Sequence, residues 1–387
     1  MNLDKGKFAI MSNKILFSAN TSWYIYNFRA SLIKVLIEEG FEVYALAPWD
    51  EYVERLEKLG CKHIHINIDN KGKNPFKEIF TIFDYYKIYK KLNPVVILNF
   101  TPKPNIYGSI AAKFLEIKCV NNIAGLGTAF INSGFLSKVV KILYRYSQKN
   151  VYRVFFQNSD DMEMFISSNI VKEDQADLLP GSGVELDKFK PQNAQQNGNG
   201  VRFVLIARLI WDKGVGEFAG AAEIVKKQYP DAEFDLIGHI DNNNPSAVSE
   251  EKIKEWESND ILKWHGRQDD VRPFIAKADC VVLPSYYREG TPRTLLEAAS
   301  MAKPLIAADT IGCREPVEDG ITGFLCMPKD ANDLAEKMIK IIEMSHDDRV
   351  KMGKRGRKKM EAEYDSNIVI NKYLEIIQKS IKQSKTL

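Results

Sequence analysis

Short segments that are almost wholly apolar alternate with amphipathic helical segments along this chain, and this alternation constrains the fold more than any other feature. Strands buried on both faces read as continuous apolar runs, and their alternation with helices is typical of parallel sheets. The sequence therefore predicts an α/β fold with a parallel, doubly wound sheet in the first half. The expected strands there are KILFSA (14–19), EVYALAP (42–48), HIHIN (63–67), PVVILNF (94–100), CVNNIAG (119–125) and RVFFQN (153–158).

The same alternation starts again after PQNAQQNGNG at 191–200, which has the composition of a linker. A length of 387 residues also fits two domains. We expect an N-terminal domain at 1–190, the linker at 191–200, a C-terminal domain at 201–365, and a helix at 366–387 that returns to the N-terminal domain. Ligands of doubly wound sheets bind beyond the carboxyl ends of the strands, so two facing units predict a cleft between them.

Several absences narrow the class of protein. The five cysteines are scattered and form no C-x-x-C pair, which favours a reducing cytoplasm over a disulfide framework or a zinc site. No apolar run of about 18 residues occurs, and MNLDKGKFAIMSNK at the N-terminus lacks the apolar core of a signal peptide. There is no P-loop, D-x-D, G-x-S-x-G or H-E-x-x-H motif, and neither half has the G-x-G-x-x-G of a dinucleotide-binding dehydrogenase.

The net charge of +3 conceals an uneven distribution of charge. Residues 1–150 hold 21 Lys/Arg and 12 Asp/Glu, a balance of +9, whereas the rest hold 33 and 39, a balance of −6. No acidic residue occurs from Ile117 to Ser159. Five basic residues follow one another there at helical spacing, with apolar residues between them: Lys138, Lys141, Arg145, Lys149 and Arg153.

This pattern is typical of an amphipathic helix on an anionic membrane surface. An ordinary core-packed helix with a solvated basic face is an equally good interpretation. Nucleic acid is not an expected partner, because no nucleic-acid-binding module accompanies the charge.

The most informative segment is SYYREGTPRTLLE at 285–297, between an apolar strand and a helical pattern. Thr291 is a suitable helix N-cap and Pro292 suits the first helical position, so free backbone N–H groups there could bind a phosphate. Glu289 precedes the helix and Glu297 follows eight residues later. Carboxylates beside a phosphate site can accept hydrogen bonds from the hydroxyls of a sugar and a ribose. Two unrelated surface glutamates are the alternative.

A second segment, ARLIWDKG at 207–214, ends the first strand after the linker. Arg208 and Lys213 flank this loop, and their charges suit a diphosphate leaving group. A solvated basic turn is the alternative. Gly238, His239 and the residues around Arg267 follow other strands of the same half and could approach a nucleotide. In the N-terminal half, the corresponding loop begins SANTSW at 18–23.

These residues together resemble family 4 of the retaining glycosyltransferases, which have the GT-B fold. The matching pieces are NFRASLIKVLIEEGFEVYALAP, PNIYGSIAAK, GLGTAF, GSGVELDKF, ARLIWDKGV and EGTPRTLLEAASMAKPLIAADTIGCREPVEDGITGFL. The last piece is the most specific, and together they span nearly the whole chain. Within the family, the sequence is most similar to bacterial enzymes that extend undecaprenyl-diphosphate-linked saccharides, among them N-acetylgalactosaminyltransferases.

The resemblance implies a metal-independent transferase without a cofactor, which uses a UDP-sugar donor and a lipid-linked saccharide acceptor in surface polysaccharide or glycan assembly. It implies a cytoplasmic location, peripheral on the inner face of the plasma membrane. Catalytic roles fall to Glu289, which would bind donor-sugar hydroxyls, and to Arg208 and Lys213, which would bind the diphosphate. The implied nucleotide-binding residues are Glu297 on the ribose, Gly290, Thr291, Pro292, Arg293, Thr294 and Leu295 by their backbone, Arg267 near the uracil, and Gly238 and His239. The implied acceptor side comprises Asn20, Thr21, Ser22, Trp23, Lys103 and Asn105.

The sequence departs from the family pattern at one position. Related enzymes often have a histidine just before the K-x-N segment, where this chain has Pro102. That histidine is thought to contact the donor sugar, so the sequence leaves this contact open, and Lys103 is an alternative. No convincing nucleophile is visible, which favours front-face departure over a covalent intermediate. Two other functions stay open: a non-catalytic nucleotide-sugar-binding scaffold subunit, and a nucleotide-sugar epimerase or hydrolase.

Overall fold

The computed structural model describes residues 12–69, 75–126, 135–192, 200–241 and 244–383, which form two compact units. The first unit contains the chain up to Ser182 together with the chain from Asn367 onward. The second unit runs from Gly183 to Ser366.

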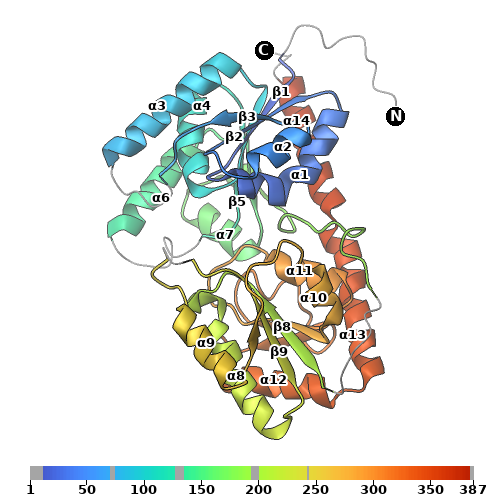
Figure 1. Ribbon diagram of the computed structural model, residues 1–387. Coiled ribbons are helices and arrows are strands. Elements are labelled where there is room, and N and C mark those ends of the chain that lie inside the picture. Colours follow the sequence, from blue (N-terminus) through green and yellow to red (C-terminus); the bar gives the residue numbers. More distant parts are fainter. Residues whose placement is uncertain (1–11, 70–74, 127–134, 193–199, 242–243, 384–387) are drawn as a thin grey trace. The chain divides into compact units, whose positions relative to one another are not determined.

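The first unit is a seven-stranded parallel sheet with helices on both faces (Figure 1), which confirms the expected doubly wound α/β fold. In spatial order its strands are β3 (Lys62–His65), β2 (Glu42–Ala47), β1 (Lys14–Ser18), β4 (Val96–Asn99), β5 (Cys119–Ile123), β6 (Arg153–Phe156) and β7 (Ala176–Leu178). Its helical elements are α1 (Ser22–Glu38), α2 (Val53–Lys58), α3 (Pro75–Leu92), the π-helical turn η1 (Pro104–Gly108), α4 (Ser109–Phe114), α6 (Phe135–Gln148), α7 (Ser159–Ser167), the 3₁₀ turn η2 (Glu173–Gln175) and α14 (Ser366–Gln383).

Two hydrophobic cores lie on the two faces of this sheet. On one face, α3, α4 and α6 cover the strands, and α3 contributes the buried side chains of Tyr85 and Tyr89. On the other face, α1, α2 and α14 pack over the strands. Tyr373 of α14 is fully buried there, with its ring 5.1 Å from that of Phe155 and 6.1 Å from that of Phe100. The expected C-terminal helix is therefore an integral layer of the first unit.

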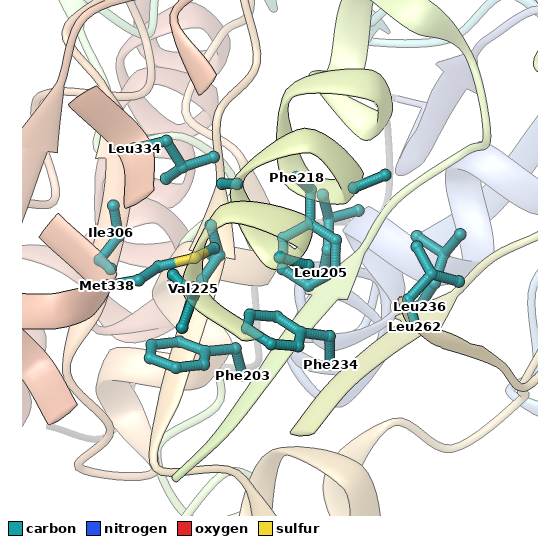
Figure 2. Close-up of a cluster of buried hydrophobic side chains, with 14 of the residues drawn as sticks. Phe203, Leu205, Phe218, Val225, Phe234, Leu236, Leu262, Ile306, Leu334 and Met338 are labelled. Carbon is teal, nitrogen blue, oxygen red and sulfur yellow. The ribbon is translucent and has the colours of Figure 1, made fainter. Parts of the chain in front are cut away.

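The second unit is a six-stranded parallel sheet. In spatial order its strands are β10 (Lys263–Trp264), β9 (Glu233–Ile237), β8 (Arg202–Ile206), β11 (Cys280–Leu283), β12 (Leu305–Ala308) and β13 (Gly323–Cys326). Its helical elements are the 3₁₀ turn η3 (Trp211–Lys213), α8 (Val215–Gln228), α9 (Glu250–Ser258), α10 (Arg272–Lys277), α11 (Arg293–Ser300), α12 (Ala331–Glu343), α13 (His346–Lys359) and the π-helical turn η4 (Met360–Tyr364). Figure 2 shows one of its cores, where Phe203 and Phe234 of neighbouring strands stack under Phe218 of α8.

The boundary between the units differs from the expected linker at 191–200. Val184 is fully buried and Phe189 is 4% exposed, both in a core of the second unit. The guanidinium of Arg357 donates to the carbonyls of Leu186 and Phe189, at 3.2 Å each. The chain has therefore already joined the second unit at Gly183, before the polar stretch, whose residues 193–199 lie outside the described part. The polar composition at 191–200 therefore did not mark the division between the units.

Two local expectations are also corrected. The basic stripe at 138–153 is not one helix, because α6 ends at Gln148 and Arg153 is the first residue of β6. Helix α11 begins at Arg293, and Pro292 is its N-cap residue in an extended conformation without a side-chain cap. Thr291 therefore precedes the cap, and its side chain is buried.

Candidate active site

The candidate site of the second unit lies where the direction of strand addition in its sheet reverses. Strands β9 and β10 lie on one side of β8, whereas β11, β12 and β13 lie on the other. The loops after β8 and β11 therefore diverge from neighbouring strand ends, and ligands of doubly wound sheets bind at this switch point. These two loops carry Arg208 and Lys213, and Glu289, respectively.

The two loops meet through an ion pair between the Nζ of Lys213 and the Oε1 of Glu289. The two side chains are only 13% and 14% exposed. The Oγ of Ser285 lies 3.2 Å from the same carboxylate oxygen, and Lys213 also lies over the ring of Tyr287 at 5.7 Å. The carbonyl of Asp212 holds the second loop by accepting from the amides of Tyr286 and Tyr287, each at 3.0 Å. The structure thus brings together two residues that are 76 positions apart in the sequence.

Glycines allow the loops to approach this closely. Gly312, with a φ of 90°, follows β12, and a Cβ there would overlap the carbonyl oxygen of Gly290. Gly214, with a φ of 75°, would similarly overlap the carbonyl of Pro284. Only glycine tolerates both the positive φ and the close backbone contact. The position of Glu289 is therefore fixed by backbone packing on two sides.

A second carboxylate, that of Glu297, lies about one turn into α11. The Nε of Arg293 is 2.8 Å from the Oε1 of Glu297 across one turn of α11, and the side chains are 20% and 13% exposed. Burial raises the pKa of Glu297, while the charge of Arg293, and then that of Lys188, acts to lower it. The Oγ1 of Thr294 donates to the carbonyl of Ile206 at 3.2 Å and fastens the helix to β8. Arg293 and Glu297 therefore form a second half-buried ion pair.

Exposed basic residues lie along the carboxyl ends of β8, β9 and β10: Arg208, His239 and Arg267. Burial lowers the pKa of His239, and the positive charges of Arg267 and Arg208 lower it further, against an opposing effect of Asp241. The partial burial and the two neighbouring guanidinium groups thus favour the neutral imidazole. The arrangement attracts anions without using the charge of histidine.

Two of the backbone groups expected to meet a nucleotide are already engaged. The amide of Leu295 donates to the carbonyl of Pro292 at 3.2 Å, and its side chain is fully buried. The amide of Gly238 donates to the carbonyl of Gly266 at 2.9 Å. The amides of both residues are therefore engaged within the second unit.

The N-terminal loop expected on the acceptor side lies at the matching position of the first sheet, between β1 and β4. The amide of Asn20 donates to Thr101 Oγ1 at 3.0 Å, Thr21 caps α1 by accepting from the amide of Tyr24, and Ser22 donates to the carbonyl of Pro48. Trp23 is 42% exposed. The loop is thus fixed by its own hydrogen bonds and presents Trp23 to solvent.

Lys103 and Asn105, which were expected on the acceptor side, lie at the start of the turn η1, where Lys103 is partly buried and Asn105 is buried. The Nζ of Lys103 is paired with Glu78 of α3 and also donates to the carbonyl of Asp69. Asn105 is 1% exposed, and its amide donates to the carbonyl of Asn122 at 2.9 Å. Lys103 is thus held in an ion pair and Asn105 in the interior of the first unit, and their roles toward an acceptor stay predictions.

Sequence reasoning missed a buried amide network beside them. The side-chain amide of Asn121 donates to Ser109 Oγ at 2.8 Å and to Gln148 Oε1 at 2.6 Å, and its oxygen accepts from Asn99 at 2.9 Å. Asn99 is the last residue of β4, and Asn121 is the central residue of β5. An asparagine within an apolar strand was the sequence signal that could have indicated this network.

No group of three or more His, Cys, Asp or Glu side chains that could hold a metal ion occurs among the described residues. Within the same residues, no helix is both long enough and apolar enough to span a bilayer.

Comparison with solved structures defines the class. A glycosyltransferase from Rickettsia africae ESF-5 aligns with a TM-score of 0.78 and 20% identity, and covers 96% of this chain and 99% of its own. That likeness shows the fold, so the chain has the two-domain GT-B architecture of glycosyltransferases. The model of glycosyl transferases group 1 matches residues 187–359, and the glycosyl transferase 4-like model matches residues 14–158.

Two curated relatives identify the family. The N,N'-diacetylbacillosaminyl-diphospho-undecaprenol alpha-1,3-N-acetylgalactosaminyltransferase of Campylobacter jejuni is 30% identical over 95% of this chain and 99% of its own length. The UDP-Gal:alpha-D-GlcNAc-diphosphoundecaprenol alpha-1,3-galactosyltransferase of Escherichia coli is 26% identical over 69% of this chain and 71% of its own. The chain belongs to the group 1, family 4-like glycosyltransferases. The resemblance inferred from the sequence is thereby confirmed, and the protein is a glycosyltransferase.

Proposed function

We propose that this glycosyltransferase moves an N-acetylhexosamine such as N-acetylgalactosamine, with retention, from a UDP donor to a lipid-diphosphate-linked saccharide in bacterial glycan or polysaccharide assembly. The single observation that carries the proposal is the half-buried Lys213–Glu289 pair at the switch point between β8 and β11. One member can neutralise phosphate and the other can accept hydroxyl hydrogen bonds. The names of the Campylobacter and Escherichia relatives support a lipid-diphosphate acceptor.

The roles follow from charge. Breaking the sugar–phosphate bond leaves a negative charge on the diphosphate, and Arg208 and Lys213 would stabilise that charge as it develops. Binding of the diphosphate by Lys213 would release Glu289 to accept hydrogen bonds from the donor-sugar hydroxyls. Glu297 would accept from the ribose, and the backbone near Gly290 and Arg267 would approach the phosphates and the uracil. We assign front-face departure of the leaving group, with these residues as binding and electrostatic groups.

The acceptor implies a membrane surface, and α6 is the element we assign to it. Lys138 and Arg145 are exposed on α6, Lys149 is exposed just beyond it, and Lys141 is half-buried. Basic side chains near an anionic leaflet attract it electrostatically. The protein would then act at the cytoplasmic face of the plasma membrane. Changing all four residues to Glu should reduce co-sedimentation with anionic vesicles, and unchanged sedimentation would remove α6 from the proposal.

The first test of the proposed donor is thermal stability with UDP, GDP, ADP and NAD. A ligand at 100 times its dissociation constant stabilises the folded state by about 2.7 kcal/mol. For units of this size, that raises the melting temperature by roughly 5 to 10 °C. We expect a shift with UDP and a much smaller one in Glu297→Ala. A shift with GDP or ADP alone would indicate a GDP-sugar or ADP-sugar donor in place of a UDP-sugar. No shift with any nucleotide would contradict the proposal.

A further inference from the structure

The outward side of the layer α3–α4–α6 in the first unit has an unusual concentration of exposed apolar side chains. Twelve large apolar residues are strongly exposed among the described residues, and six of them lie on these three helices. They are Ile79, Phe80 and Phe83 on α3, Phe114 on α4, and Ile142 and Tyr146 on α6. The three helices cover the same face of the sheet (Figure 1), so their solvent sides belong to one surface.

The exposed stripe of α3 changes character along the helix. Its N-terminal part presents Ile79, Phe80 and Phe83, which are 50%, 68% and 57% exposed. One to two turns further on, the exposed residues are Lys87, Lys90 and Lys91. The opposite side of α3 is anchored in the core by Tyr85 and Tyr89. One helix therefore offers aromatic rings at one end and ammonium groups about 10 to 15 Å away.

The charge around this surface is mainly positive. Lys138 and Arg145 of α6 are exposed, and Lys113 of α4 lies 4.4 Å from the ring centre of Tyr146, which joins α4 to α6. The two acidic residues of α3 are less accessible: Glu78 is paired with Lys103, and Asp84 is half-buried.

We propose that the outward surface of α3–α4–α6 inserts into the lipid bilayer, with Phe80 and Phe83 below the headgroups and Lys87, Lys90 and Lys91 at headgroup level. This inference rests on the proposed function for the identity of the membrane. It depends on insertion of apolar side chains of α3 and not on the charge of α6. Apolar side chains with flanking lysines match an interface that is apolar below and anionic above. A second copy of the chain is a poorer occupant, because a twofold contact would bring the same basic groups together.

Attraction between charges and burial of apolar side chains depend differently on salt, so a salt series distinguishes their contributions to membrane binding. Screening weakens the attraction between exposed charges at high ionic strength, whereas burial of apolar area is not weakened. We would measure co-sedimentation with vesicles of phosphatidylethanolamine and phosphatidylglycerol at about 0.1 M and 0.5 M salt. Wild type should retain much of its binding at the higher salt. The variant Phe80→Ser/Phe83→Ser should bind vesicles about tenfold or more weakly than wild type at both salt concentrations.

The matched control is Ile321→Ser/Met327→Ser, which removes two apolar side chains of the second unit that are 48% and 62% exposed. This variant should bind vesicles like wild type. No donor or acceptor is present in the assay, so a failure here would leave the UDP measurement and the proposed reaction intact. Equal binding of wild type and Phe80→Ser/Phe83→Ser would overturn the inference.

The depth order is tested with an environment-sensitive fluorophore attached to single introduced cysteines. All five native cysteines are buried, so labelling can be directed to Phe80→Cys, Phe83→Cys, Lys91→Cys or Met327→Cys. On vesicle binding, emission should rise most at positions 80 and 83, less at 91, and not at 327. No rise at position 80 in sedimenting protein would refute insertion. A wild-type dimer in solution that becomes monomeric in Phe80→Ser/Phe83→Ser would instead assign the surface to a second copy.

Discussion

The two sheets reverse their strand order in the same way, yet the loops at the two switch points have different chemistry. Between β8 and β11, Lys213 and Glu289 meet as a half-buried ion pair. Between β1 and β4, the loop is fixed by the bond from Asn20 to Thr101, and the nearby amides are packed in a buried network. Each sheet has a switch point, but the ion pair that joins the two loops at a switch point belongs to the second unit. We infer that the second unit binds the nucleotide through charged side chains, whereas the loop of the first unit is held by hydrogen bonds and packing.

The largest expected effect tests the charged switch point. Lys213→Met and Glu289→Gln should each lower kcat/KM by about 100-fold or more, because each removes a group aimed at charge or hydroxyls in the transition state. Each variant should still show a cooperative melting transition, although removal of one partner from a half-buried pair lowers the melting temperature. Lys252→Met is the control, since it breaks an exposed ion pair with Glu255 in the same unit and should leave turnover unchanged. Turnover within threefold of wild type in both site variants would break the comparison.

The next effect tests the packed switch point of the first unit. Asn121→Ala removes a fully buried amide that bonds Asn99, Ser109 and Gln148, and leaves their polar groups unsatisfied. We expect a loss of about 2–3 kcal/mol in the free energy of unfolding. The melting transition should fall by about 5 to 10 °C. UDP affinity should not change.

The control for Asn121 is Asn13→Ala, which removes an exposed side-chain bond to the carbonyl of Gly40. It should cost much less stability than Asn121→Ala. If Asn121→Ala melted like wild type but lost activity, the network would belong to a binding site and the proposed contrast between the units would be wrong.

The smallest effect sharpens the role of charge within the second unit. Burial raises the pKa of Glu297, and the charge of Arg293 acts to lower it. Lys188 also lowers this pKa, whereas the charge of Glu185 raises it. In Arg293→Met the pKa should rise further, so the ionised fraction falls at acidic pH. UDP should then bind about tenfold more weakly at about pH 6 but only slightly more weakly at about pH 8. Calorimetric titration measures both, and Arg293→Lys should restore part of the acid-side affinity. A loss that is equal at both pH values would show that Arg293 acts other than through ionisation of Glu297.

The sequence was most informative where a property is local. Apolar runs located the strands, because strand burial depends on neighbouring residues, and the alternation of strand and helix placed Glu289 in a loop and Glu297 in a helix. It was least informative where contacts join distant segments. The pairing of Lys103 with Glu78, the burial of Asn105 and the division at Gly183 all depend on which elements pack together. The exposed rings of α3 were also missed, because an apolar run does not reveal how many of its sides a fold covers.

Helix α14 has a consequence for the order in which the protein can fold during synthesis. Its Tyr373 fills a core with Phe100 and Phe155, the guanidinium of Arg29 lies 4.5 Å from the centre of the Phe100 ring, and Lys118 donates to the carbonyl of Ser380 at 2.7 Å. The ribosome therefore releases the whole second unit before the first unit receives its last layer. Until α14 has been synthesised, the part of the sheet face that α14 covers in the first unit stays exposed. A nascent chain arrested before α14 should thus bind chaperones through the first unit while the second is already protected.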